Sequence, residues 1–243
     1  MFHPVVLVAI IASAAFWMGY LYDKGRFRKE PVFNLAAACL LGFAAGFLCF
    51  EAYKILRASG LTLDFSSMLR RSSRTRFFLY SVFEIGVIEE LFKFFPFYIA
   101  VLRWKDFDEK IDGVVYAAVI AFGFASFENL FYLPRLRGFS LFGRAMASPL
   151  THSIFSSFWG YLVGLAVIRK KPLLPAAAAG ILLAGFIHGV FDYLTSSDAL
   201  RLFSALLILV IWVWQISFLE KEGARRLRKS PTTGERLPPP PGG

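Results

Sequence analysis

The sequence predicts an all-α membrane protein, a polytopic transmembrane helical bundle of about seven spans. Three observations lead to this fold class: 57% of the 243 residues are hydrophobic, only 18% are charged, and apolar stretches long enough to cross a bilayer recur along the chain. Soluble domains carry about 25% charged residues, so the composition argues against a soluble, disordered or nucleic-acid-binding protein. The net charge of +10 fits Lys and Arg in cytoplasmic loops beside anionic head groups, so the expected partner is the lipid bilayer and no nucleic acid.

Seven windows qualify as spans, because a hydrocarbon core of about 30 Å needs about 20 apolar residues. They are residues 4–22, 32–50, 77–102, 113–133, 146–168, 174–194 and 202–219. The first is predicted to be an uncleaved span, because it lacks the basic segment that opens a signal peptide. Between the second and third windows, Asp64 followed by Phe65 and Met68 predicts a capped amphipathic helix at the membrane interface.

The chain is predicted to form one membrane domain, residues 1–219, whose motif-bearing core covers 77–194. The tail, 220–243, is basic and rich in proline, so we expect it to be disordered. The first, third and fifth loops and the tail together hold more Lys and Arg than the other loops, which predicts an amino terminus outside and a carboxyl terminus inside. Cys39 and Cys49 lie ten residues apart on one predicted helix, too far to form a disulfide.

The third window carries ionisable residues that a membrane normally excludes. Glu89 and Glu90 lie near its middle, where a lipid-exposed carboxylate costs about 2.5–3.5 kcal/mol, so both are expected to face the bundle interior or water. Lys93 follows at helical spacing on the same face and can pair with either carboxylate, so a purely structural Glu–Lys pair is the alternative. Pro96 predicts a kink just beyond. Glu84, about 140° around the helix from Glu89, is left out of the site.

Three further windows place polar residues at a common depth. Glu128 and Asn129 lie near the end of the fourth window, His152 near the start of the fifth, and His188 near the end of the sixth, followed at helical spacing by Asp192. Because successive helices are antiparallel, these positions lie on one side of the membrane, roughly 8–10 Å deep, with the two glutamates of the third window near ~18 Å. Polar residues with unrelated structural roles would not be expected to lie at the same depth on four helices. The sequence therefore predicts one shared site, on the extracytoplasmic side.

Four motifs in these windows, taken in order, resemble those of the PrsW family of intramembrane proteases, relatives of the CAAX prenyl endopeptidases that are grouped with them as glutamic-type membrane proteases. They are EExxK at Glu89–Lys93, FxxxEN at Phe124–Asn129, HxxFxxxxG at His152–Gly160 and HxxxD at His188–Asp192. The resemblance covers about half of the chain, residues 77–192. Four motifs in register on four consecutive predicted spans are a far more specific signal than any one of them.

The resemblance implies an endopeptidase that hydrolyses a peptide bond in a membrane-anchored protein substrate, for example an anti-sigma factor-like regulator, in the bacterial cytoplasmic membrane. Carried over motif by motif, it implies four catalytic residues, Glu89, Glu90, His152 and His188. It implies four supporting residues, Lys93, Glu128, Asn129 and Asp192.

Peptide hydrolysis inside a membrane needs a sequestered water, a base that deprotonates it, and a group that stabilises the oxyanion. We expect Glu89 to be the base, with Glu90 holding the water or pairing with Lys93. His188, oriented by Asp192, would polarise the scissile carbonyl. Asp192 could instead be a residue that reaches toward the interface. His152 and the polar pair of the fourth window would complete the cavity.

Zinc is the competing mechanism, and the family has also been grouped with metalloproteases. His152, His188 and one carboxylate from Glu89, Glu90, Glu128 or Asp192 would satisfy a three-ligand catalytic zinc site. The HExxH motif is absent, however, and the nearby Lys93 would oppose a dication. We therefore expect catalysis without a cofactor, with zinc as the alternative.

Two interpretations from other classes remain open. A proton-coupled transporter would use buried Glu, His and Asp side chains as a relay, but transporters usually show inverted repeats or broken helices in paired positions, and the sequence shows neither. A membrane scaffold would explain the GxxxG pairs Gly42/Gly46 and Gly160/Gly164 as helix packing. It leaves the intramembrane carboxylates unexplained, so the protease interpretation is favoured.

Overall fold

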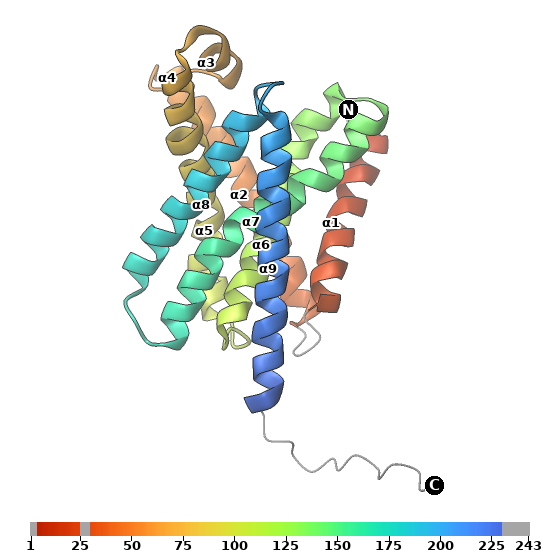
Figure 1. Ribbon diagram of the computed structural model, residues 1–243, viewed down its shortest axis with the longest axis vertical. Coiled ribbons are helices and arrows are strands. Elements are labelled where there is room, and N and C mark those ends of the chain that lie inside the picture. Colours follow the sequence, from red (N-terminus) through yellow and green to blue (C-terminus); the bar gives the residue numbers. More distant parts are fainter. Residues whose placement is uncertain (1–3, 25–29, 230–243) are drawn as a thin grey trace, which may run out of the picture.

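The computed structural model describes residues 4–24 and 30–229, and all regular structure within these ranges is helical. Long helices stand side by side in one bundle (Figure 1). The predicted all-α class is thereby confirmed. Residues 1–3, 25–29 and 230–243 lie outside the described residues, and with them the proline-rich part of the tail predicted to be disordered.

Within the described ranges the bundle contains seven long helical segments. These are α1 (Pro4–Lys24), α2 (Val32–Ala58), the run of α4 (Arg74–Leu79), the π-helix η1 (Tyr80–Val87) and α5 (Ile88–Ile99), then α6 (Lys110–Tyr132), α7 (Gly138–Ile168), α8 (Leu173–Thr195) and α9 (Arg201–Lys229). Short elements connect them: α3 (Phe65–Arg71) and the 3₁₀ turns η2 (Val101–Arg103) and η3 (Leu133–Arg135).

Among the described residues, six helices are long and apolar enough to cross a membrane, and they coincide with six of the seven predicted windows. The third window corresponds to α4, η1 and α5, which follow one another directly over residues 74–99. Its division into three elements and the charges within it set this run apart from the six. Six apolar helices and this run agree with the expectation of about seven spans.

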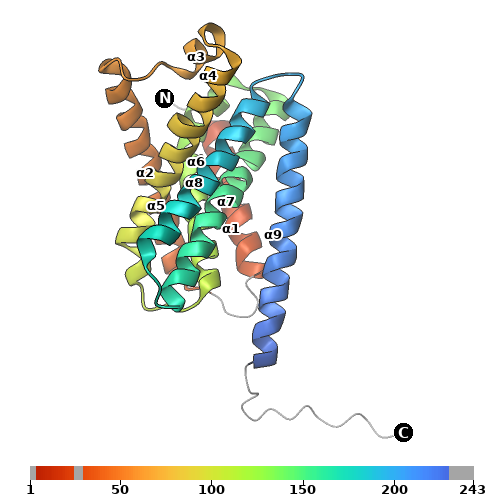
Figure 2. The same cartoon turned by 60° about the vertical axis from the view of Figure 1, so that its left-hand side comes forward.

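Helix α6 lies at the centre of the bundle and α9 at its edge. Within their apolar windows, 78% of α6 is buried by protein but only 6% of α9. Helices α2 and α7 make the most extensive contacts with α6, and α8 packs against α7 and η1. Figure 2 shows α9 at the border of the bundle beside α7 and α8. The residues of α6 are therefore shielded from lipid, whereas α9 has the exposure of a lipid-facing helix.

Glycines allow the helices around the site to approach closely. A Cβ atom on Gly42 would lie 2.9 Å from the Cα atom of Ile120 on α6, and one on Gly86 would lie 2.9 Å from the backbone nitrogen of Gly189 on α8. Real Cβ atoms do not make such contacts, so only glycine fits. Gly160 likewise faces Gly113 of α6. Both GxxxG pairs therefore pack helices together.

The capped helix predicted after Asp64 is present as α3. Asp64 caps it by accepting a hydrogen bond of 3.0 Å from the backbone N–H of Ser67. Figure 1 shows α3 at the end of the bundle where α8 connects to α9. The cavity described below opens at this end.

Helices α2 and α9 extend well beyond their predicted ends. Helix α2 continues past the predicted end at Phe50 to Ala58, and α9 continues past Leu219 to Lys229. Residues 220–229, expected to belong to a disordered tail, are thus helical, because this stretch holds strong helix formers such as Glu, Lys, Ala and Arg without proline.

Candidate active site

The ionisable residues predicted to share a site do meet inside the bundle. Helix α5 contributes Glu89, Glu90 and Lys93, α6 contributes Glu128, α7 contributes His152, and α8 contributes His188 and Asp192. The rings of His152 and His188 lie 5.0 Å apart between centroids. The antiparallel-depth argument therefore predicted a real cluster.

Glu90 is the most completely bonded residue of this cluster. Its Oε1 accepts a hydrogen bond of 2.7 Å from Lys93 Nζ and lies 3.1 Å from His188 Nδ1. Its Oε2 accepts hydrogen bonds from Ser156 Oγ at 2.7 Å and Trp159 Nε1 at 2.9 Å. The side chain is fully buried. Four donors around one carboxylate fill its acceptor positions, so Glu90 has none left for a substrate or water.

Glu89 differs from its neighbour although both are buried. Among the described residues its Oε2 has no hydrogen-bond partner. His188 Nε2 lies 3.7 Å and Lys93 Nζ 3.9 Å from this oxygen, both beyond hydrogen-bond distance. Glu89 also lines the cavity described below. It therefore has an acceptor oxygen available to a molecule in that cavity.

His152 lies between a cation and an anion. Lys93 Nζ is 2.8 Å from its Nδ1, and Glu128 Oε2 is 2.9 Å from its Nε2. Because the ammonium of Lys93, which also pairs with Glu90, has only hydrogens to offer, Nδ1 must accept and Nε2 must carry the proton that Glu128 accepts. The ammonium also sits 4.5 Å from the ring centroid of Phe124, a favourable cation–π contact. The two neighbours thus fix the tautomer of His152.

His188 is held by Glu90 more directly than by Asp192. Its Nδ1 lies 3.1 Å from Glu90 Oε1, whereas its Nε2 lies 3.6 Å from Asp192 Oδ2. The ring of Phe155 stacks on the imidazole at 4.7 Å between centroids. The spacing of four residues between His188 and Asp192 correctly predicted that Asp192 lies near the imidazole. The closer orienting contact comes from Glu90. The sequence did not reveal that the Glu90 side chain points from α5 toward His188.

Asn129 does not line the cavity. It is fully buried, and both polar atoms of its side chain lack a hydrogen-bond partner within the described ranges. The motif that contains it therefore places Glu128 at the site and Asn129 behind it, since adjacent residues on a helix point about 100° apart.

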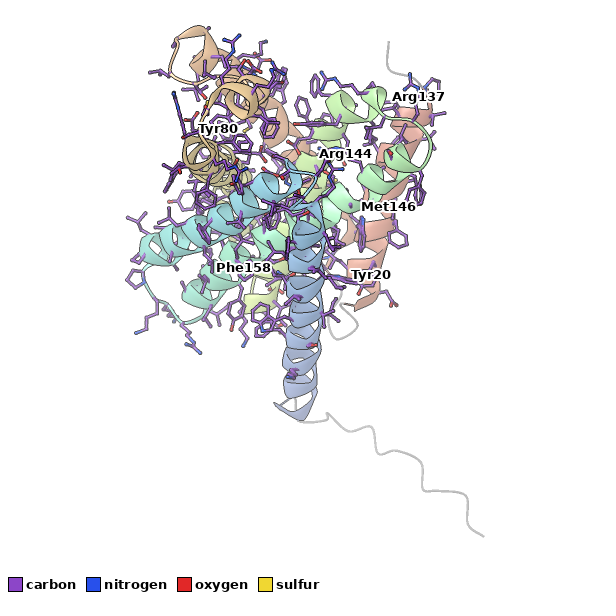
Figure 3. All side chains as sticks on the ribbon, turned by 45° about the horizontal axis from the view of Figure 1, so that its top comes forward. Tyr20, Tyr80, Arg137, Arg144, Met146 and Phe158 are labelled. Carbon is purple, nitrogen blue, oxygen red and sulfur yellow. The ribbon has the colours of Figure 1, made fainter. Side chains whose placement is uncertain are left out.

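A cavity of about 770 Å³ connects the cluster to the outside. Its buried end holds Glu89, His152 and His188, and its other end holds the exposed residues Leu63 and Arg135. Its walls are rich in aromatic side chains: Phe50, Phe124, Phe127, Phe131, Phe155 and Phe191. In Figure 3, Tyr80 on η1 and Arg144 on α7 mark two of its sides. The site is therefore a deep apolar pocket with a few convergent polar groups, the usual form of a small ligand or active site.

Two positioning residues of α7 were not identified from the sequence. Ser156 and Trp159 follow His152 by four and seven residues and bind Glu90 through Oε2. This spacing puts them on the same helical face as His152. The spacing was visible in the sequence, but neither residue is charged, and neither stood out.

Helix α1 supplies hydrogen-bond donors to the backbone of α7 just before His152. Pro149 has no N–H to donate to the carbonyl of Ala145. The hydroxyl of Ser13 on α1 donates to that carbonyl instead, and Trp17 Nε1 donates to the carbonyl of Met146 at 2.8 Å. Met146 is labelled in Figure 3. A helix that carries no motif therefore satisfies the backbone of the helix that carries His152.

The profile of a family described as PrsW family intramembrane metalloprotease matches residues 30–217. The chain belongs to the PrsW family. Proteins named Protease PrsW are similar to it: that of Geobacillus kaustophilus is 28% identical over 85% of this chain and 87% of its own length. The protein of Clostridioides difficile is 29% identical over 84% and 85%, and that of Bacillus subtilis is 25% identical over 86% and 91%. No solved structure matches the chain significantly.

Membership in the PrsW family supports an intramembrane protease in a bacterial membrane. The four motifs that carried the resemblance lie within the matched region. The apolar helices agree with an integral membrane protein, and the protease family implies a membrane-protein substrate.

The name of the PrsW family raises the question of whether these residues fit a metal ion. Glu89, His152 and His188 each offer a ligand atom, and these atoms lie within 4.8 Å of one another. The residue types therefore suit zinc. The hydrogen bonding does not, because the contact from Lys93 to Nδ1 of His152 leaves Nε2 protonated and without a lone pair for a metal.

Proposed function

We propose that this chain is an intramembrane endopeptidase that cuts a membrane-anchored protein, for example an anti-sigma factor-like regulator, with Glu89 as the general base that activates water. The contrast between the two adjacent glutamates carries the proposal. Glu90 is saturated by four donors, whereas Glu89 lines the cavity and, within the described residues, has an oxygen without a partner. A base must reach the water that it deprotonates, and of these two carboxylates only that of Glu89 meets this requirement.

The reaction begins when a water beside Glu89 transfers a proton to Oε2 while its oxygen forms a bond to the scissile carbonyl carbon. The carbonyl electron pair moves onto the oxygen, and His188 Nε2–H donates a hydrogen bond to the resulting oxyanion. The C–N bond then breaks, and the proton on Glu89 passes to the leaving nitrogen. For this role His188 carries protons on both ring nitrogens, and the carboxylates of Glu90 and Asp192, at 3.1 and 3.6 Å, stabilise that cation.

The remaining residues of the cluster hold the reacting groups in position. Glu90 holds His188 and Lys93, and Lys93 in turn holds His152 through Nδ1. Glu128 accepts from the opposite nitrogen of His152. A chain of fixed donors and acceptors keeps each group in place before the substrate arrives, which is how an enclosed site stabilises a transition state.

We propose that this reaction proceeds without a metal ion. His152 has no free lone pair while Lys93 donates to it, and Lys93 Nζ lies 3.9 Å from Glu89 Oε2, where its charge would oppose a dication. A zinc ion held by Glu89, His188 and a third donor would instead polarise the carbonyl and activate water as a Lewis acid.

Cleavage of a single-span substrate by the purified, reconstituted protein tests the base. Glu89→Gln keeps the size of the side chain and removes its basicity, so we expect the rate to fall by about 10²–10⁴-fold. Glu84→Gln is the matched control, because Glu84 lies on the same helical run but binds Tyr53 and Thr62 outside the cluster. Cleavage by a folded Glu89→Gln protein at the parental rate would overturn the assignment. Proton flux that Glu128→Gln abolishes, without any cleavage, would favour a transporter.

Chelation and elemental analysis test the metal-free mechanism. We expect activity to survive exhaustive chelation, with less than stoichiometric metal in the purified protein. Loss of activity that only added Zn²⁺ restores would overturn this part of the proposal and leave the protease assignment intact.

A further inference from the structure

Three arginines surround the outer end of the cavity. Arg57 lies at the end of α2, Arg135 in η3 and Arg144 in the first turns of α7, and all three line the cavity. The carboxylates that line it are Glu89, Glu128 and Asp192, which belong to the buried cluster. We call Arg57, Arg135 and Arg144 the arginine rim.

The arginine rim has donors to spare. Within the described ranges the structure gives none of the three guanidinium groups a hydrogen bond or an ion pair to a protein acceptor. Arg137, two residues after Arg135, differs because its Nη1 donates to two backbone carbonyls, those of Pro134 and Leu136. Unpaired guanidinium groups around a pocket suit a carboxylate, which can accept two parallel hydrogen bonds from each.

Arg144 is held ready for such a ligand. Its guanidinium lies 3.8 Å from the ring centroid of Tyr132, and its Nε is buried without a partner among the described residues. Stacking on an aromatic ring fixes the plane of the guanidinium, so little side-chain freedom is lost when an anion binds. The arginine is half-buried in the cavity wall, a place that suits a ligand inside the cavity better than a lipid outside the bundle.

The spacing along the helices sets the distance from the rim to the reacting atoms. Arg144 precedes His152 by eight residues, and Arg135 follows Glu128 by seven, so the Cα atoms of both arginines lie about 10–12 Å along the helix axis from those of His152 and Glu128. An extended peptide advances about 3.3 Å per residue. A substrate bound at the cluster would therefore bring its third or fourth residue from the scissile bond to the rim.

We propose that the arginine rim binds an acidic residue of the substrate, three or four positions from the scissile bond on the side that leaves the bundle at this end. This inference rests on the proposed protease function and adds a specificity that the four motifs do not contain. In the predicted topology this end is extracytoplasmic, where the positive-inside rule does not call for arginine. The acidic residue would draw the scissile bond into register with Glu89.

Paired single-span peptides test the rim in vesicles of neutral phosphatidylcholine. One series carries Asp at the third or fourth position from the cleaved bond, and the matched series carries Asn or Lys there. We expect the parent protein to cleave the Asp peptides with a kcat/KM about tenfold above the Asn peptides, the preference of one charge-assisted contact. Arg144→Glu should lose this preference and favour the Lys peptides.

Two further variants keep the test decisive. Arg135→Glu, at an exposed position, repeats the charge reversal if Arg144→Glu does not fold. Arg137→Glu is the control, since Arg137 does not line the cavity, and Figure 3 labels it apart from Arg144. It should keep the parental preference for Asp.

The possible failures are distinguishable. Equal cleavage of Asp and Asn peptides by an active parent overturns the rim and leaves the protease proposal standing. Activity that rises with added anionic lipid, whatever the charge of the peptide, assigns the rim to lipid phosphate and also overturns it. A folded parent that cleaves no peptide of either series, and is matched in this by Glu89→Gln, contradicts the proposed function itself.

Discussion

Glu89 and Glu90 are adjacent, buried and carried by one helix, yet only Glu89 lines the cavity, while Glu90 accepts hydrogen bonds from Lys93, Ser156 and Trp159. The difference follows from helix geometry, since adjacent side chains point about 100° apart. One carboxylate therefore turns toward the cavity and the other toward α7 and α8. The two glutamates belong to one sequence motif but have different roles: Glu89 is available for chemistry, and Glu90 holds the site together.

This division predicts opposite effects on stability. Glu90→Gln leaves the buried Lys93 without its closest anion, so we expect the free energy of unfolding to fall by about 3–5 kcal/mol. Glu89→Gln removes a buried carboxylate oxygen that has no hydrogen-bond partner among the described residues, so we expect the stability to stay within about 1 kcal/mol of the parent or to rise. Denaturant unfolding in detergent micelles measures both, with Glu84→Gln as the control. Equal losses for the two variants would contradict the division.

Trp159→Phe tests the support of Glu90 from α7. The substitution keeps an aromatic ring against Phe97, whose centroid is 5.0 Å away, but removes the Nε1 hydrogen bond to Glu90. A hydrogen bond to a charged group contributes about 1.5–3 kcal/mol, and we expect a loss of stability of that size. We also expect kcat to fall more than KM rises, because Glu90 holds His188. Trp214→Phe is the control, since Trp214 is 56% exposed on α9; if both variants behaved alike, the indole would not support Glu90.

Much of this arrangement could be predicted from the sequence. Hydropathy locates the spans because each must supply about 20 apolar residues, and antiparallel order then places Glu128, His152 and His188 at one depth. Rotation about each helix axis was harder to predict in detail. The polar face of the third window shows that Glu89 and Glu90 point into the bundle but not which of them reaches the cavity, and Asn129 lies in a span whose apolar residues surround it on every side.

Other contacts depend on long-range packing that no local pattern contains. The hydroxyl of Ser13 and the carbonyl of Ala145 are 132 positions apart in the chain. The break of the third span into α4, η1 and α5 was equally hidden. The widened turn of η1 is accompanied by a hydrogen bond of 2.6 Å from the Tyr53 hydroxyl to the carbonyl of Glu84, which only the folded bundle brings together.

Helix α1 is predicted to affect catalysis although it carries no motif. Trp17→Phe removes the donor to the carbonyl of Met146, six residues before His152. We expect a loss of stability of about 1 kcal/mol and a fall in kcat, because this bond holds the turn of α7 just before His152. Rates and unfolding measured on the same reconstituted sample separate the two effects. Phe16→Leu is a suitable control, since Phe16 is 54% exposed on the same helix; an unchanged kcat in Trp17→Phe would restrict α1 to a packing role.

The close approach of η1 to α8 predicts an effect of a single methyl group. A Cβ atom on Gly86 would lie 2.9 Å from the carbonyl carbon of Gly185 and from the backbone nitrogen of Gly189. Because both neighbours are backbone, the helices must move apart, and overpacking of this kind costs about 1–3 kcal/mol. Gly86 precedes Glu89 by three residues and Gly189 follows His188 directly, so the same movement should separate Glu89 from His188.

We expect Gly86→Ala to lose both stability and cleavage. Gly19→Ala is the control, because nothing lies within 4 Å of that position, and it should match the parent or gain up to about 1 kcal/mol of stability. Full cleavage by Gly86→Ala would mean that the distance between Glu89 and His188 does not depend on this contact.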